Sequence, residues 1–519
     1  AQRMTTRNHA LRNTVFSSIG IYTEYFLGMI ATIRIARHLG SRYYGIYGLF
    51  IWFAAVGVVV TNSGITTGVI KFVAELRGSG REDLIVPLLA HLRRVQHWHL
   101  ALVMAAGVVL FVVAGKHFAA DLDILEFALL MFAVGMRAPY MFNIAIAKGF
   151  EAFDATAKVA LVAAPLNLLM VVAAMLLHAP ITWFLVVYAT SSALFLLASR
   201  FHARRLLRAL PRPGDLPAEL LRRMRRHLRI VSVTIIVSFL IASDVEILFL
   251  NLYATPTSAG YFKVAYQLAT GIMLLVPGVF GALLLPMMAK ALSQGRAVAG
   301  QRFVDVTSYL LLLAAPVTGF GIVFSGSVIG LLYGGVYAAA APVFAWCLFA
   351  GAVSTVTQGA SSLLISADRQ HTILTMTLVF GALKFALDMT LIWRFGLPGA
   401  VIAIVTETLA SSITFQVIGM RVSGVQLAWS RLSRIVLASL LATLLASLFN
   451  RLHLLPILTL LLGGITLTVA YLLLTVLLGC WSVADIVQLQ GLHQRFAAGR
   501  PQLLGRLLSW SGARAGRQQ

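Results

Sequence analysis

Fourteen long apolar stretches run through this chain, and nearly every second gap between them is rich in arginine and lysine. About 20 apolar residues are enough for a helix to span the hydrocarbon core of a bilayer. The stretches lie roughly at 13–38, 45–71, 92–114, 122–147, 156–178, 180–203, 229–252, 259–289, 303–333, 339–366, 371–393, 398–421, 430–450 and 454–480. The sequence therefore predicts an all-α polytopic membrane protein with about 14 transmembrane helices.

Composition favours the same fold class. The chain is 59% hydrophobic and 11% charged, whereas soluble globular proteins carry about 25% charged residues. A net charge of +23 is also typical of proteins that bind nucleic acid. The basic residues lie in short loops beside the spans, however, and no basic groove with stacking aromatic residues is evident. We expect no nucleic-acid partner.

The distribution of basic residues predicts the orientation of the chain. With the N-terminus placed in the cytoplasm, 32 of the 41 Lys and Arg residues fall on the cytoplasmic side, six fall outside and three lie within spans. Such an excess is the positive-inside signal. It predicts a multi-pass protein whose N- and C-termini are both cytoplasmic.

The longest connection, 200–229, carries two arginine clusters around three prolines and separates the first six spans from the next six. We expect an N-lobe of helices 1–6 (1–203), a basic cytoplasmic linker (204–228), a C-lobe of helices 7–12 (229–421), helices 13 and 14 (430–480) and a basic tail (481–519). The tail is either an amphipathic helix on the membrane surface or a frayed basic segment.

The two six-span blocks repeat a short motif. Tyr44-Gly45-Ile46-Tyr47 enters the second span, and Ala259-Gly260-Tyr261-Phe262 enters the eighth. Parallel halves joined by a long inner loop are typical of secondary transporters, whose substrate sites lie near the membrane midplane.

Eight ionisable residues interrupt the apolar spans. Each costs about 2.5–3.5 kcal/mol if it faces lipid at the centre of a helix, so these residues must face one another, water or a cavity. They are Glu24, Arg137, Asp244, Glu246, Lys263, Lys384, Asp388 and Glu407.

Some of these charges can neutralise one another. Lys384 and Asp388 are four residues apart and share a helix face, so they form either a structural pair or part of a functional site. Asp244 and Glu246 point about 200° apart on a helix, so only one of them can face a given partner. Lys263 lies at a similar depth and can pair with either carboxylate.

The first span carries a carboxylate in its middle and two arginines toward its outer end. Glu24 is the candidate for a group that senses protons or ions. Arg34 and Arg37 either bind an anion or extend to the interface as snorkelling side chains.

Two further charges have equally open roles. Arg137 precedes Pro139, which frees a backbone carbonyl that the guanidinium can satisfy; the alternative is a functional cation. Glu407 is either a coupling carboxylate or a hydrogen-bonded link between helices.

The sequence contains no GxxxxGK[ST] phosphate loop and no HExxH motif. Cys347 and Cys480 both lie in apolar stretches, which is typical of small buried residues and not of a disulfide or metal framework. We expect no catalytic residue, no metal and no cofactor, and therefore a protein that is not an enzyme.

Several motifs resemble one known family. The run from Arg37 to Tyr47, the motif Asn62-Ser63-Gly64-Ile65 and the motif Lys71-Phe72-Val73-Ala74-Glu75 resemble the N-terminal signature of Wzx-type polysaccharide-precursor flippases. These proteins belong to the multidrug/oligosaccharidyl-lipid/polysaccharide (MOP) exporter superfamily. Ala367-Asp368-Arg369 and the segment 396–400 extend the resemblance into the second half, over about residues 10–450.

The resemblance implies two six-helix lobes in a V around a central cavity, plus two C-terminal helices. It implies translocation of undecaprenyl-pyrophosphate-linked oligosaccharide across the bacterial inner membrane by alternating access, for surface polysaccharides such as O-antigen or exopolysaccharide. Membrane lipids and other polysaccharide-assembly proteins are the implied partners. Helices 1, 2, 7 and 8 line the cavity in this superfamily.

The intramembrane charges and the implied cavity together define a candidate site. The expected substrate-binding residues are Arg34, Arg37, Asn62, Arg137, Lys263 and Lys384. The expected ion-coupling residues are Glu24, Asp244, Glu246, Asp388 and Glu407, with H⁺ or Na⁺ as the coupling ion.

Three other functions remain open. A lipid II flippase also has fourteen spans, whereas a cation-coupled drug antiporter of the same superfamily usually has twelve. An integral-membrane polysaccharide polymerase or ligase normally carries a sizeable external loop, and the predicted outer loops here are short.

Overall fold

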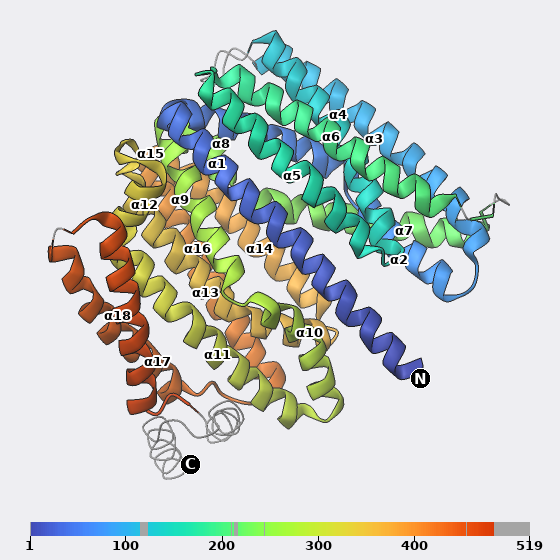
Figure 1. Cartoon of the computed structure of the whole chain (residues 1–519). Helices are drawn as coiled ribbons and strands as arrows, with labels where there is room; N and C mark the ends of the chain where they lie inside the picture. The colour runs from blue at the N-terminus through green and yellow to red at the C-terminus, as the bar shows by residue number, and fades with distance from the viewer. Residues whose placement is uncertain are drawn as a thin grey trace. The chain divides into compact units, whose positions relative to one another are not determined.

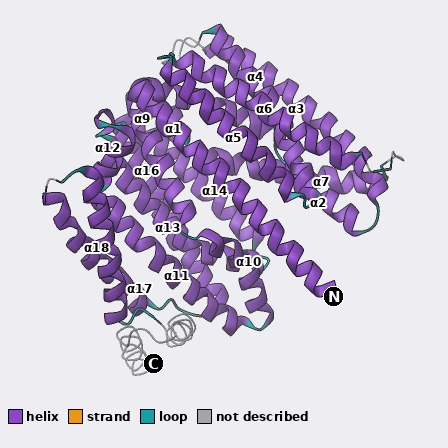
Figure 2. Ribbon diagram, in the orientation of Figure 1, coloured by secondary structure: helices purple, strands orange, loops and turns teal. Residues whose placement is uncertain are grey.

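The structure is a computed structural model that describes residues 2–114, 123–208, 210–211, 216–242, 244–452 and 454–481. Every regular element within these ranges is helical, and no strand occurs among them (Figure 2). The predicted all-α fold is confirmed. The predicted tail beyond residue 481 lies outside the described residues.

The chain folds into two compact units. Unit 1 comprises Ala1–Lys263 and Phe385–Ala400, and unit 2 comprises Val264–Lys384 and Val401–Gln519. Unit 1 therefore contains one short segment from the second half of the chain, Phe385–Ala400, in addition to the first half.

Unit 1 is built from the first eight α-helices, the start of α9 and the segment around residue 390 (Figure 1). The elements are α1 (Gln2–Asn62), α2 (Ile65–Gly78), η1 (Glu82–Leu84), α3 (Ile85–Ala114), α4 (Ile124–Gly149), α5 (Phe153–Leu176), α6 (Ile181–Leu207), α7 (Ala218–Ala242), α8 (Val245–Tyr253), α9 (Pro256–Leu275), the π-helix η3 (Asp388–Ile392), α15 (Trp393–Phe395) and the start of α16 (Leu397–Ser423).

Unit 2 contains the rest of α9 and α16 and the remaining helices. These are α10 (Gly278–Ser293), α11 (Arg296–Val323), α12 (Ser325–Tyr333), η2 (Gly335–Tyr337), α13 (Ala340–Ser366), α14 (Gln370–Leu387), α17 (Trp429–Ser447), η4 (Leu448–Leu452) and α18 (Pro456–Leu477).

Among the described residues, eleven helices are long and apolar enough to cross a membrane, or twelve if α7 and α8, which are bent by 49°, make one span. The first two predicted spans both lie in α1, which consists of two helices joined at a kink at Gly40, between the predicted spans; the second span continues after a short break into α2. The total of about 14 spans stays a prediction.

The segment expected as a linker is largely helical. Helix α6 continues to Leu207 and α7 begins at Ala218, so the basic residues from 218 onward are the first turns of a helix.

Two glycines interrupt the long N-terminal helix. Gly40 has φ 71° and ψ 171°, and Gly64, between α1 and α2, has φ 70°. A Cβ on Gly64 would lie 2.6 Å from the Ser232 hydroxyl and 2.8 Å from the Leu228 carbonyl oxygen of α7. The Ser232 hydroxyl also donates to the Ser63 carbonyl at 2.8 Å. Only glycine allows both this backbone conformation and this close approach.

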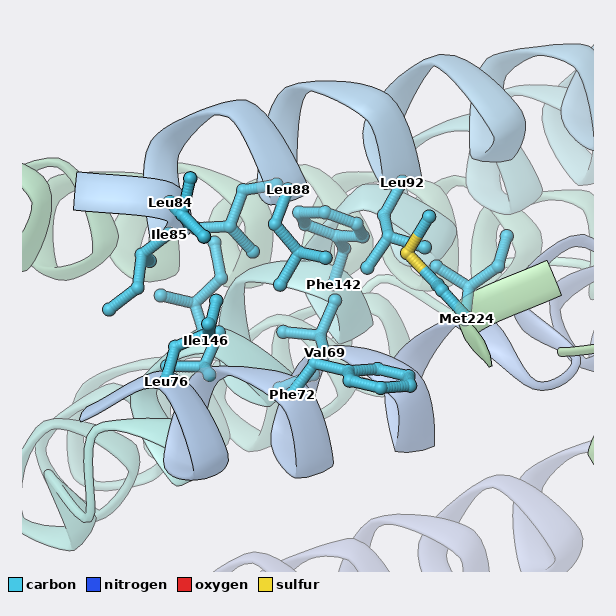
Figure 3. Packing of buried hydrophobic residues seen from close by; sticks show 14 of the residues in the cluster. Val69, Phe72, Leu76, Leu84, Ile85, Leu88, Leu92, Phe142, Ile146 and Met224 are labelled. Carbon is cyan, nitrogen blue, oxygen red and sulfur yellow. The ribbon is translucent and has the colours of Figure 1, made fainter. Parts of the chain in front are cut away.

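The core of unit 1 includes a cluster where α2, α3, α4 and α7 meet (Figure 3). Phe72, Leu88, Phe142 and Met224 each bring a fully buried side chain from one of these helices. This cluster packs α7 against α2, α3 and α4.

The outer face of α3 is apolar. Trp98, Leu102 and Val112 are 73%, 69% and 76% exposed. Large apolar side chains this exposed over many turns are unfavourable in water but match a lipid environment. Together with the apolar helices, they show a multi-pass membrane protein.

The last two helices form a hairpin on α11 and α12 within unit 2. The Tyr471 hydroxyl donates to the Leu312 carbonyl at 2.8 Å, and Arg431 Nε donates to the Cys480 carbonyl at 2.7 Å. Helix α18 approaches α12 through Gly463, where a Cβ would lie 2.3 Å from Cζ of the buried Phe324.

Gly463→Ala is expected to destabilise the protein by about 1–3 kcal/mol, because the added methyl group overlaps the Phe324 ring in a packed core. Gly464→Ala is the matched control, since its Cβ would make an ordinary 3.5 Å contact with Phe320 and alanine favours a helix by up to about 1 kcal/mol. Thermal unfolding of the purified variants measures both effects. Equal midpoints would contradict the packing of α18 on α12.

Candidate functional site

Helices α1 and α9 cross at two glycines with their backbones in contact. A Cβ on Gly45 would lie 1.8 Å from the Pro256 carbonyl oxygen, and a Cβ on Gly260 would lie 1.9 Å from the Ser41 carbonyl oxygen. Ser41 is four residues before Gly45, and Pro256 is four residues before Gly260, so the two contacts are reciprocal. Small residues at this spacing let membrane helices approach closely.

This crossing joins the two sequence motifs that repeat between the halves of the chain. Gly45 belongs to the motif 44–47 and Gly260 to the motif 259–262. The repeated glycines lie against each other in unit 1, related as the two partners of a pseudo-symmetric contact. We refer to this contact as the glycine crossing.

An ion pair lies beside the glycine crossing. The Lys263 ammonium contacts the Asp244 carboxylate, and both side chains are 17% exposed. The stem of Lys263 passes over Gly48 of α1, with its Cγ 3.6 Å from where a Cβ would stand. The missing side chain at Gly48 thus leaves the room in which the Lys263 stem reaches Asp244.

The backbone of Asp244 explains which carboxylate pairs with Lys263. Asp244 is not within a helix: it is the N-cap of α8, with φ 50° and ψ 25°. The 200° separation predicted between Asp244 and Glu246 assumed one continuous helix and does not apply. Glu246 lies in the first turn of α8 and is 1% exposed, where the helix N-terminus favours a negative charge.

A second buried carboxylate lies on an element that packs against α8. Asp388 is fully buried and begins the π-helix η3, and η3 contacts α8. The ring of Phe249 in α8 meets that of Phe385 edge-on at 5.3 Å. Wide π-helical turns often mark functional positions in membrane and soluble proteins. Glu246 and Asp388 are therefore buried acids on adjoining elements of unit 1.

Arg137 is held by aromatic rings on α4 and α6. Its guanidinium lies 5.8 Å from the ring centroids of Tyr140 and Tyr188 and 5.4 Å from that of Phe195. Tyr47 of α1 is within electrostatic range. In the described residues, neither an acid nor the carbonyl freed by Pro139 binds this cation. Aromatic faces stabilise it without neutralising its charge.

Buried amides link α1, α3, α4 and α6. Gln96 Nε2 donates to Asn62 Oδ1 at 2.6 Å and to the Ala138 carbonyl at 2.9 Å. Arg93 donates to Asn143 Oδ1 at 2.9 Å, and Asn143 Nδ2 donates to the Ser199 hydroxyl at 3.1 Å.

Asn62, an expected substrate-binding residue, thus belongs to a structural hydrogen bond. Gln96 and Asn143 were not predicted, because Asn62 was the only amide considered among the candidate residues. Glu126, also missed, is 8% exposed and accepts from Thr182 at 2.9 Å.

The remaining predicted residues lie on α1, α14 and α16. Arg34 and Arg37 are exposed on α1 ahead of the break at Gly40, and the side chain of Glu24 lies outside the described part. Glu407 is half-buried on α16 in unit 2. Lys384, 6% exposed, lies one turn before Asp388. No group of acids, histidines and cysteines suited to a metal occurs among the residues that were described.

No family model and no curated protein matches the sequence, but solved structures match the fold. A structure of the lipid II flippase MurJ in an inward closed conformation has a TM-score of 0.70 at 13% identity, over 89% of this chain and 98% of that chain. An inward-facing multidrug resistance MATE family transporter of the MOP superfamily has a TM-score of 0.60 at 13% identity, over 79% and 98%. A MATE in complex with MaL6 has a TM-score of 0.53 at 14% identity, over 80% of this chain and 96% of that chain.

The chain has the fold of the MOP superfamily. The resemblance read from the sequence is confirmed at this level, whereas membership of the Wzx-type branch stays a prediction, since 13% identity shows the fold alone.

Gly45→Ala is expected to force the glycine crossing apart, because the new methyl group meets a backbone oxygen that no side-chain rotation can move. We expect a loss of about 1–3 kcal/mol in the free energy of unfolding. Gly28→Ala is the control on the same helix, since nothing lies within 4 Å of its Cβ position. Thermal or detergent unfolding compares the two variants. A Gly45→Ala protein as stable as Gly28→Ala would show that the crossing is not close.

Breaking the pair with Asp244→Asn or Lys263→Met is expected to cost about 1–3 kcal/mol, since each change leaves a partly buried charge without its partner. Asparagine tolerates the left-handed conformation at residue 244, so the change tests charge and not backbone strain. The double variant is expected to be less destabilised than the sum, which a double-mutant cycle measures. The exposed pair of Lys158 and Asp154 is the control, with a coupling below about 0.5 kcal/mol. Equal coupling in both pairs would refute burial of the first.

Proposed function

We propose that this protein is a flippase that moves a lipid-linked oligosaccharide between the leaflets of the bacterial inner membrane. The observation that carries the proposal is the fold match with MurJ over 98% of that chain. The match also covers 10% more of this chain than the match with the MATE family transporter, about 52 of 519 residues. That excess is close to the length of the α17–α18 hairpin, which favours the flippase branch of the fold over the drug antiporters.

Charge in the membrane supports a substrate with an anionic head group. Arg137 is an uncompensated cation among aromatic rings, far along α4 from either helix end. A pyrophosphate accepts strong charge-assisted hydrogen bonds from a guanidinium where water is excluded. The prenyl tail stays in the bilayer while the head group crosses along the polar residues.

The ion pair at the glycine crossing provides a gate. Lys263 is neutralised by Asp244 while α1 and α9 are in contact. A pyrophosphate competes with the carboxylate for this ammonium, so substrate binding weakens the pair and the crossing with it. The released Asp244 then takes up H⁺ or Na⁺, and Glu246 and Asp388 are the further candidates for coupling.

A lipid II flippase is the second candidate, because the MurJ structure carries that description. Its substrate shares the prenyl pyrophosphate and differs in the sugar, so the cations above serve either substrate. A drug antiporter would need no cation for its substrate, and a polymerase or ligase would release a longer glycan. Other polysaccharide-assembly proteins are the partners we expect for the oligosaccharide flippase.

Proteoliposomes with a fluorescent undecaprenyl-pyrophosphate-linked oligosaccharide test the function. We expect the purified protein to make both leaflets accessible to a quencher, and Arg137→Gln to slow the initial rate about tenfold or more, because a charge-assisted contact is lost. Arg394→Gln is the matched control, since Arg394 also stacks on an aromatic ring but lies at a helix end.

Each other outcome of this experiment favours a different function for the protein. Movement of lipid II alone would favour the second candidate, and uptake of a cationic drug without lipid movement would favour an antiporter. Glycan extension in the same vesicles would indicate a polymerase. An unchanged rate in Arg137→Gln would remove Arg137 from the substrate path.

A further inference from the structure

A pocket of about 260 Å³ lies between α2 and α7 in unit 1. One of its lining residues, Phe72, belongs to the buried cluster shown in Figure 3. Its lining combines basic and imidazole side chains with apolar ones: Lys71, Phe72, Arg223, Arg226, His227, Ile230 and Val231. We call it the α2–α7 pocket.

The carboxylates of Glu75 and Glu219 near the pocket both interact with Arg223. Glu75 accepts from both arms of Arg223, at 2.9 and 3.0 Å, and Glu219 also interacts with Arg223. Lys71 and Arg226 have no carboxylate partner within the described part of the chain. The pocket therefore keeps two positive charges that the protein itself does not neutralise.

The ring of Phe72 organises the basic groups. Lys71 Nζ lies 5.5 Å and the Arg223 guanidinium 5.9 Å from its centroid, and the His227 ring meets it edge-on at 5.6 Å. His227 Nε2 is buried and has no hydrogen-bond partner among the described atoms. A buried ring nitrogen without a partner, in a pocket that carries excess positive charge, leaves a hydrogen-bonding position that a ligand can fill.

The apolar residues of α7 that line the pocket suit a hydrocarbon chain. Ile230 is 55% exposed, and Val233, one turn further along α7, is 59% exposed. The apolar side chains continue from the pocket along the predicted span, while the cations stay near its predicted cytoplasmic end. This arrangement fits an amphiphile with an anionic head and an apolar tail.

We propose that the α2–α7 pocket binds the phosphate head group of an anionic phospholipid of the predicted cytoplasmic leaflet. Lys71 and Arg226 contact the phosphate oxygens, and His227 Nε2 meets a further oxygen of the phosphate or glycerol. The first acyl carbons lie along Ile230 and Val233. Basic pockets between membrane helices on this side bind such head groups. The volume lies below the 300–1,000 Å³ of pockets that enclose whole ligands, as expected if the tail remains in the bilayer.

The bound lipid would reinforce the contact of α2 with α7. Arg223 and Glu75 already join these helices, and the lipid phosphate would join them again through Lys71 of α2 and Arg226 of α7. Binding is therefore linked to the stability of unit 1, because a ligand that binds only the folded state stabilises it. This role is independent of the transported substrate.

Native mass spectrometry of the purified full chain, titrated with phosphatidylglycerol, tests the proposal. The Lys71→Ala/Arg226→Ala variant is expected to bind this lipid about thirtyfold more weakly, from about 1 kcal/mol for each basic residue. Arg225→Ala/Arg229→Ala is the matched control, because it removes two exposed arginines from the same helix that do not line the pocket. The control is expected to bind within about twofold of the parent protein.

Further measurements with other ligands identify what the pocket binds. Phosphatidylcholine is expected to bind far more weakly than phosphatidylglycerol, and inorganic phosphate is expected not to displace the lipid at equal concentration. Added phosphatidylglycerol is expected to raise the unfolding temperature of the parent and the control but not of the pocket variant.

Equal losses in the pocket variant and the control would overturn the proposal in favour of unspecific attraction to a basic helix. Phosphate competing as well as the lipid would show an anion site without a lipid. A pocket variant that unfolds early without lipid is replaced by Lys71→Gln/Arg226→Gln, which removes both charges and retains polar side chains larger than alanine. Because binding is measured without transport, failure here leaves the flippase proposal intact, and failure of transport leaves this one intact.

Discussion

The backbone contact between Gly45 and Gly260 is the constraint on which the rest of the candidate site depends. Membrane helices gain little from the hydrophobic effect against each other, so their association rests on close packing. Two missing Cβ atoms bring α1 and α9 into contact, and a third at Gly48 makes room for the stem of Lys263. Lys263 can then reach Asp244, and the pair is shielded by the same helices that bring it together. The ion pair is therefore a consequence of the crossing, and its strength reports whether the crossing is closed.

The apolar lengths in the sequence predicted the all-helical fold because a bilayer demands about 20 apolar residues from each span, whatever its partners. Hydropathy does not register backbone torsions. The kink at Gly40 falls in the gap predicted between the first two spans, but the bend between α7 and α8 and the π-helical turn at Asp388 were absent from the prediction. The repeated motifs at Gly45 and Gly260 were visible in the sequence, but the fact that they touch depends on tertiary structure.

The candidate site was predicted in part, for reasons that differ between residues. Lys263 had two possible partners by depth, and the choice of Asp244 follows from its left-handed N-cap conformation, which a helical wheel does not include. The rings around Arg137 come partly from α6, more than 50 residues along the chain, so no local pattern shows them. Gln96 and Asn143 could have been found by searching the spans for amides, because an unsatisfied amide in hydrocarbon also requires a partner.

The charges of unit 1 divide into neutralised and uncompensated groups, and this division is what a phosphate-bearing lipid would encounter. The pairs Asp244–Lys263 and Glu75–Arg223 hold helices together. Lys71 and Arg226 remain at the predicted cytoplasmic end of the spans, and Arg137 remains in the middle of α4. Two cations on an open rim attract any anionic head group, because water and salt still reach them. A single cation enclosed by aromatic rings acts where the dielectric constant is lower, so each contact is stronger and depends more on the shape of the ligand. The two proposals, lipid binding by Lys71 and Arg226 and substrate recognition by Arg137, therefore place separate tasks on different helices of the same chain.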